Sequence, residues 1–97
     1  MTTDLDLAKQ AAYDKLAAQL KTAEATLDTV KARAETAKAN AELRVIAEVV
    51  AKKLVIEKKL LELKHAGEWE RAKKEVEAHI ADFEKAVKNI ESKVKRS

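Results

Sequence analysis

The sequence predicts an all-α fold in which long amphipathic helices form a coiled-coil hairpin or a helical bundle. The 97 residues include no proline and one glycine, and 38% of them are charged. Tight turns usually need proline or glycine, so the composition disfavours a sandwich or an α/β fold with numerous connections. Apolar residues also recur at helical spacing. We therefore expect one domain, residues 1–97, with helical segments at about 4–39, 41–65 and 68–96.

The first segment carries a heptad stripe that begins at Tyr13. Apolar residues then follow at alternating steps of three and four through Leu16, Leu20, Ala23, Leu27, Val30, Ala34, Ala37 and Ala41. This spacing is typical of a helix that packs along one seam. Thr3 and Asp6 resemble a capping box with aspartate in place of glutamate, which predicts a helix start near residue 4.

The second segment, residues 43–63, has the sequence LRVIAEVVAKKLVIEKKLLEL. At 100° per residue, ten of its apolar side chains fall within an arc of about 200°, which is wider than a two-helix seam requires, so we expect the segment to touch at least two helices. These ten are Leu43, Ile46, Ala47, Val49, Val50, Leu54, Ile56, Leu60, Leu61 and Leu63. The segment is too long for a strand. Its apolar runs of a few residues are too short to cross a bilayer.

The third segment repeats the heptad spacing from Trp69 to Val94, with Lys73 in one inward position. Before it, the order basic, glycine, acidic in KHAGEWE matches the end of one helix and the start of another. We therefore expect a sharp turn at residues 65–68, with Gly67 available for a left-handed conformation. Trp69 is expected to pack across this junction.

The junction at Asn40 is open to two interpretations. Because the surrounding sequence has neither glycine nor proline, we favour a helix that continues through Asn40, with residues 4–65 forming a rod of about 90 Å. The apolar stripe in the N-terminal half of that rod would then need a second chain. The alternative is a break near residues 39–41, which permits a closed three-helix bundle and a monomer.

Few side chains suggest a chemical site. Glu62 and His65 have a spacing found in di-iron helical proteins, but Glu62 falls on the polar side of the helix and His65 adjoins the glycine break, so ordinary capping at the surface is favoured. Glu75 and His79 could make half a metal site, but the spacing suggests no third or fourth ligand, so a solvated histidine is favoured. Lys53 and Glu57 lie inside the apolar arc and are candidates for fixing the register between helices; the alternative is that their long side chains reach out to solvent.

The composition argues against catalysis and against several partners. No serine or cysteine nucleophile stands in a recognisable arrangement, and one glycine does not make a phosphate-binding loop. We expect no enzyme activity, cofactor or metal. The net charge is +3, with acidic residues interleaved among the basic ones, so we expect no specific nucleic-acid partner. No leader peptide or transmembrane segment is evident, and the default placement is cytoplasmic.

The leading hypothesis is a non-enzymatic helical association module that assembles with itself, most simply as a dimer, or with another helical protein. Binding of an amphipathic helix to a lipid or other apolar surface is an alternative, and an engineered helical-bundle scaffold without a biological function is another. The predicted core or interface residues are Tyr13, Leu16, Leu20, Leu27, Val30, Ile46, Val50, Leu54, Leu61, Trp69, Val76, Ile80, Phe83, Val87, Ile90 and Val94.

Overall fold

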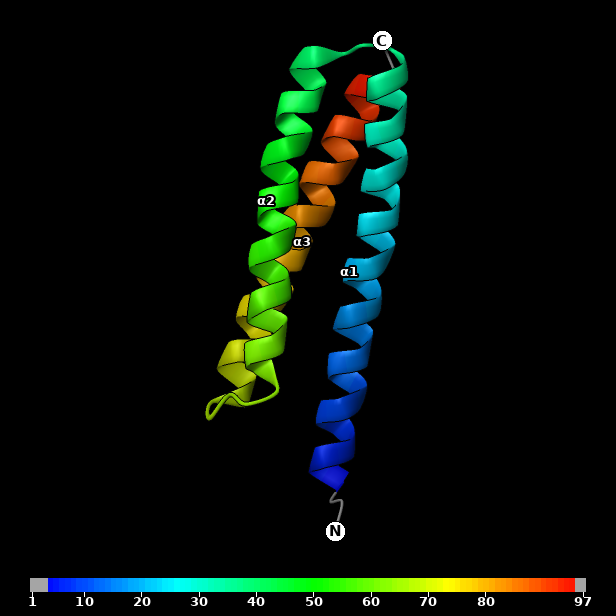
Figure 1. Ribbon diagram of the computed structural model, residues 1–97. Coiled ribbons are helices and arrows are strands. Elements are labelled where there is room, and N and C mark those ends of the chain that lie inside the picture. The colour runs from blue at the N-terminus through cyan, green and yellow to red at the C-terminus, as the bar shows by residue number, and fades with distance from the viewer. Residues whose placement is uncertain (1–3, 96–97) are drawn as a thin grey trace.

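The chain forms an up-down-up bundle of three long helices (Figure 1). The computed structural model describes residues 4–95, with α1 at Asp4–Thr36, α2 at Asn40–Leu63 and α3 at Trp69–Lys95. Each helix packs against both others, and the bundle measures 54 × 17 × 15 Å. The all-α prediction is confirmed. The predicted cap at Thr3 and the predicted last helical residue, 96, lie outside the described residues.

One apolar core runs the length of the bundle and takes a stripe from every helix. Phe83, near the middle of α3, has no exposed surface. Burying a large apolar side chain stabilises a fold by about 1.5–3 kcal/mol, so these stripes hold the helices together. The buried residues are Leu16, Leu20, Ala23, Leu27, Val30 and Ala34 of α1; Ile46, Val49, Ile56, Leu60 and Leu63 of α2; and Val76, Ile80, Phe83, Val87, Ile90 and Val94 of α3.

The predicted continuity of the first two helices is wrong, because the chain reverses at residues 37–39. The amide of Ala39 donates to the carbonyl oxygen of Ala34 at 2.9 Å, and that of Lys38 donates to Glu35 at 3.1 Å. Lys38 is left-handed, with a φ of 56°. These features define a Schellman motif, which ends a helix by satisfying its last carbonyls. The stripe of α1 is therefore buried within the same chain.

The turn between α2 and α3 occupies residues 64–68, close to the predicted position. Here α2 unwinds through short bonds in which His65 donates to Glu62 at 3.0 Å and Ala66 donates to Leu63 at 3.3 Å. The expected left-handed role of Gly67 is wrong, since its φ is not positive. An added Cβ at Gly67 would meet nothing within 4 Å. Hydrogen bonds between residues three apart, as in a 3₁₀-helix, tighten a helix end without needing a left-handed residue.

Candidate association surface

Helix α2 carries most of the large apolar side chains that the bundle leaves exposed. Leu54 and Leu61 are 58% and 61% exposed, and Val55 is 48% exposed. Val45 is also exposed, and among the α1 side chains that the structure describes Leu7 is the one exposed large hydrophobic residue. Among the described residues, α3 exposes no large hydrophobic side chain. The outward side of α2 is therefore the most apolar surface of the described bundle.

The helical rotation explains why Leu54 and Leu61 face outward. Leu60 is buried in the core, and Lys53, seven residues earlier, is half-buried on the same stripe. Leu54 and Leu61 each follow one of these residues, and one residue turns a helix by about 100°. Both leucines are thereby rotated from the core toward α1. An arc of about 200° is wider than its two neighbours cover.

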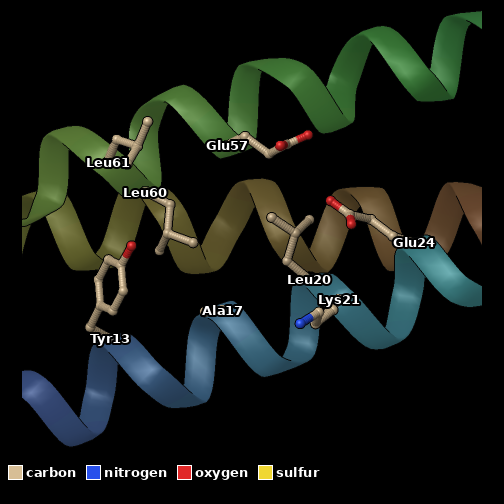
Figure 2. A pocket seen from close by; sticks show the side chains of 8 residues that line it. All are labelled: Tyr13, Ala17, Leu20, Lys21, Glu24, Glu57, Leu60 and Leu61. Carbon is tan, nitrogen blue, oxygen red and sulfur yellow. The ribbon is translucent and has the colours of Figure 1, made fainter.

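A groove between α1 and α2 reaches Leu61, one of the two exposed leucines (Figure 2). It has a volume of about 350 Å³, and Leu61 forms part of its α2 wall. Glu24 from α1 and Glu57 from α2 extend over the same groove, as Figure 2 shows. The lining residues are Tyr13, Ala17, Leu20, Lys21, Glu24, Glu57, Leu60 and Leu61.

The surroundings of Glu24 in this groove disfavour its ionised form. Burial raises the pKa of Glu24 above its usual value, and the nearby charge of Glu57 raises it further, whereas Lys53 lowers it. The flank of α2 that faces α3 differs, because Lys52 Nζ lies 3.1 Å from an Asp82 carboxylate oxygen. Both side chains of that pair are more than half exposed, so it contributes little to stability.

The residues predicted as core or interface fall into three groups. Tyr13, Val50 and Trp69 are half-buried against the core. Leu54 and Leu61 are exposed and lie outside the buried core. The buried members are Leu16, Leu20, Leu27, Val30, Ile46, Val76, Ile80, Phe83, Val87, Ile90 and Val94.

The residues considered for register or metal binding remain apart from any obvious site. Glu57 is exposed beside the half-buried Lys53, and their role in register stays a prediction. The side chains of both predicted Glu-His pairs, Glu62 with His65 and Glu75 with His79, are exposed. Among the side chains that the structure describes, residues 7–95, no three of histidine, cysteine, aspartate or glutamate cluster as a metal site would require.

Two features were missed by the sequence interpretation. Val45 and Val55 lie outside the predicted apolar arc, yet they add to the apolar surface of α2. Two lysines also lie over aromatic rings of other helices, with Lys64 Nζ 4.8 Å from the centre of the Tyr13 ring and Lys9 Nζ 5.7 Å from that of Trp69. These contacts join residues far apart in sequence, so no local pattern signals them.

The comparisons with known proteins leave the function to be argued from the geometry. No family model, curated protein or solved structure matches this chain. Over residues 4–95, no helix combines the length and apolar character that crossing a bilayer requires.

Proposed function

We propose that this chain is a non-enzymatic helical association module that forms a reversible homodimer through the outer side of α2. The observation that carries the proposal is the pair Leu54 and Leu61, seven residues apart and each about three-fifths exposed. Seven residues are two helical turns, so both leucines lie on one line along the helix. Isolated exposed leucines are ordinary, but an aligned pair beside exposed Val55 forms an apolar strip.

A second copy of the chain fits this strip because the strip is complementary to itself. The exposed residues Glu57 and Lys58 lie between the leucines, about 50° to either side of their line. In a parallel pair of α2 helices, opposite flanks meet, and Glu57 of one copy faces Lys58 of the other. An antiparallel pair would bring like charges together. The charge pattern therefore favours a parallel, two-fold symmetric dimer.

The strip continues toward the start of α2 with small residues. Ala47 lies one heptad before Leu54, and Ala47 and Ala51 are both exposed. Small side chains let a neighbouring helix approach closely, as they do in tightly packed helix pairs. The contact thus has a close-packed end at Ala47 and a leucine-rich end at Leu61.

The exposed area supports weak association. Burying what remains exposed of one leucine contributes about 1–1.5 kcal/mol, and a symmetric dimer would bury four. This gain roughly offsets the cost of association, which is at least about 4 kcal/mol, so the net affinity must come from the other apolar side chains of the strip and from the Glu57–Lys58 pairs. If these contribute a further few kcal/mol, the dissociation constant is on the order of 1 mM, and the monomer is folded below that concentration.

Sedimentation equilibrium from about 20 μM to 2 mM tests the proposal. We expect the average mass to rise toward the dimer for the natural sequence, and the double variant Leu54→Glu, Leu61→Glu to stay monomeric. The matched control Ala78→Glu, Ala81→Glu adds the same charge to exposed positions of α3 and should dimerise normally. A natural sequence that remains monomeric at 2 mM would refute the proposal.

Disulfide trapping tests the orientation, since the chain has no cysteine. Ala47→Cys places a single thiol on the proposed contact without removing a leucine. In the parallel dimer the two thiols meet, and oxidation should yield a covalent dimer. In an antiparallel pair centred between Leu54 and Leu61 they would be about 30 Å apart. Ala78→Cys on α3 is the control for random collision.

Binding to an anionic lipid surface is the second candidate function. Lys52, Lys58 and Lys59 lie next to the exposed apolar residues of α2, an arrangement that can approach a negatively charged membrane. Flotation with phosphatidylserine vesicles separates the two functions. Recovery of the natural sequence with the vesicles, lost in the Leu54→Glu, Leu61→Glu variant, would favour the lipid surface. The cytoplasmic location predicted from the sequence is consistent with either function and remains a prediction.

A further inference from the structure

Two of the three aromatic residues of the chain line one hollow at the end of the bundle where α2 turns into α3. Tyr13 reaches it from α1, and Trp69 is the first residue of α3. The hollow has a volume of about 360 Å³, within the range of sites that hold small molecules. Its lining residues are Lys9, Gln10, Tyr13, Leu63, Lys64, Ala66 and Trp69.

The charge of this lining is of one sign. Lys9 and Lys64 are its charged residues, and none of the carboxylates that the structure describes lines it. The other described hollows, between α1 and α2, beside Trp69, between α1 and α3, and between α2 and α3, each include a glutamate. In a chain whose acidic and basic residues are otherwise interleaved, the described lining of this hollow carries positive charge alone, while Glu68 and Glu70 line the adjoining hollow that shares Lys9 and Trp69.

Both lysines are held in place by ring faces. Lys64 Nζ lies 4.8 Å from the centre of the Tyr13 ring, and Lys9 Nζ lies 5.7 Å from that of Trp69. A ring face attracts an ammonium without accepting a conventional hydrogen bond from it. An ammonium has three N–H donors, so each lysine keeps donors for a further acceptor. Among the described side chains, neither lysine has a carboxylate within 4.0 Å.

We propose that this hollow binds a small organic anion with an apolar body, such as an arylalkyl carboxylate. The carboxylate would accept hydrogen bonds from Lys9 and Lys64, while the apolar body would lie against Leu63, Ala66 and the Trp69 ring. Inorganic phosphate would leave the apolar wall without a partner, and a neutral analogue would leave both ammonium groups without one. Charge and apolar surface together therefore define the ligand class.

The site is separate from the proposed dimer contact. The hollow is lined by the ends of the helices, whereas Leu54 lies in the middle of α2 and is not part of the lining. Ligand binding should therefore survive Leu54→Glu. Leu61 is left unchanged in this test, because it shares a groove with Tyr13 and a glutamate there would lie one helical turn from Lys64. Failure of one proposal leaves the other untouched.

Fluorescence of Trp69, the only tryptophan, provides the measurement. The probe is 4-phenylbutyrate at constant ionic strength, compared with 4-phenylbutanol and inorganic phosphate. We expect a saturable change for the carboxylate with a dissociation constant on the order of 1 mM. The alcohol should bind at least about fivefold more weakly, and phosphate should cause no saturable change.

Substitutions of the two lysines then test their roles. We expect Lys9→Gln and Lys64→Gln each to weaken 4-phenylbutyrate binding about three- to tenfold, because each removes one charged donor. Lys64→Arg, which keeps the charge, should retain binding. Lys21→Gln, in the groove between α1 and α2, is the matched control and should change nothing. Circular dichroism of each variant separates loss of binding from loss of fold.

Three outcomes would overturn this proposal. The first is no saturable Trp69 response to 4-phenylbutyrate up to about 20 mM. The second is equal affinity for the carboxylate and the alcohol, and the third is unchanged binding in the double Lys9→Gln, Lys64→Gln variant. With any of these results, the lysine-ring contacts would serve only to fasten α1 to the turn at residues 64–68.

Discussion

The hairpins α1–α2 and α2–α3 share helix α2, but their turns differ in backbone conformation. The first turn uses a left-handed Lys38 and contains no glycine, whereas the second contains Gly67 in a conformation open to any residue. Their flanks differ as well. Glu24 faces the like charge of Glu57 beside the first hairpin, while Lys52 and Asp82 form an ion pair across the second.

This difference shows that the residue type at a turn does not reveal whether the backbone there is left-handed. At Lys38 the demand comes from the hydrogen bonds of the Schellman motif, which fix the left-handed residue whatever its side chain. A left-handed lysine costs roughly 1–2 kcal/mol, which burial of the α1 stripe against α2 and α3 offsets. At Gly67 there is no such demand. Substitutions can therefore act on each turn separately.

The largest expected effect comes from Ala39→Pro in the first turn. Ala39 has a φ of −80°, which suits proline, but the substitution removes the N–H that bonds to Ala34 and disfavours the left-handed Lys38 before it. We expect a loss of about 3 kcal/mol in the free energy of unfolding, measured by urea denaturation. Ala39→Ser keeps the N–H and should stay within about 0.5 kcal/mol. A proline variant as stable as that control would contradict the Schellman assignment.

Lys38→Gly is expected to have the next largest effect, and of the opposite sign. Glycine adopts positive φ without the steric cost that lysine carries, so the variant should gain about 1 kcal/mol. Lys38→Ala keeps a Cβ and should leave the stability nearly unchanged. Thermal and urea unfolding of the two variants separate backbone strain from the loss of the lysine charge, and equal stability of the two would show that Lys38 is not strained.

Gly67→Ala tests the second turn and should give a smaller gain. The backbone there is acceptable to alanine, and the added Cβ has open space. Restricting the unfolded chain should stabilise the protein by about 0.5 kcal/mol. A loss of stability in urea denaturation would instead show that the backbone at Gly67, like that at Lys38, disfavours a residue with a Cβ.

The smallest expected effect concerns the flank of the first hairpin. Because the pKa of Glu24 is raised in the folded protein, its ionised form disfavours folding, and this penalty is absent below the unfolded value of 4.5. Glu24→Gln should therefore be more stable than the natural sequence at pH 7, by less than about 0.5 kcal/mol given solvent screening. The difference should vanish as the pH falls below that value. Melting temperatures from pH 3 to 8 would reveal the opposite slope if the assignment is wrong.

The two turns also mark how far the sequence could predict the fold. The helices were predictable because apolar spacing and an absence of proline act over many residues and leave no competing structure. The turn at residues 64–68 was found through Gly67, although the glycine does not have the predicted conformation. The turn at Lys38 was missed because its cause is tertiary. Packing α1 against two helices outweighs the local preference to continue.

The candidate association surface illustrates a second limit. A wheel drawn for α2 places Leu54 and Leu61 within one apolar arc, but it does not specify how much of the arc two neighbouring helices will cover. Only the packed bundle shows that both leucines remain outside. The aromatic hollow was less accessible still, since Lys9 and Trp69 are sixty positions apart and no periodicity links them.

The odd number of helices in the bundle also determines where its first helix begins and its last helix ends. Because the polypeptide passes the long axis three times, α1 begins at one end of the 54 Å bundle and α3 finishes at the other (Figure 1). Anything fused before α1 and after α3 would be held apart by that length rather than side by side, as a two-helix hairpin would hold it. Tension applied through the two ends of such a bundle would shear the helices along one another.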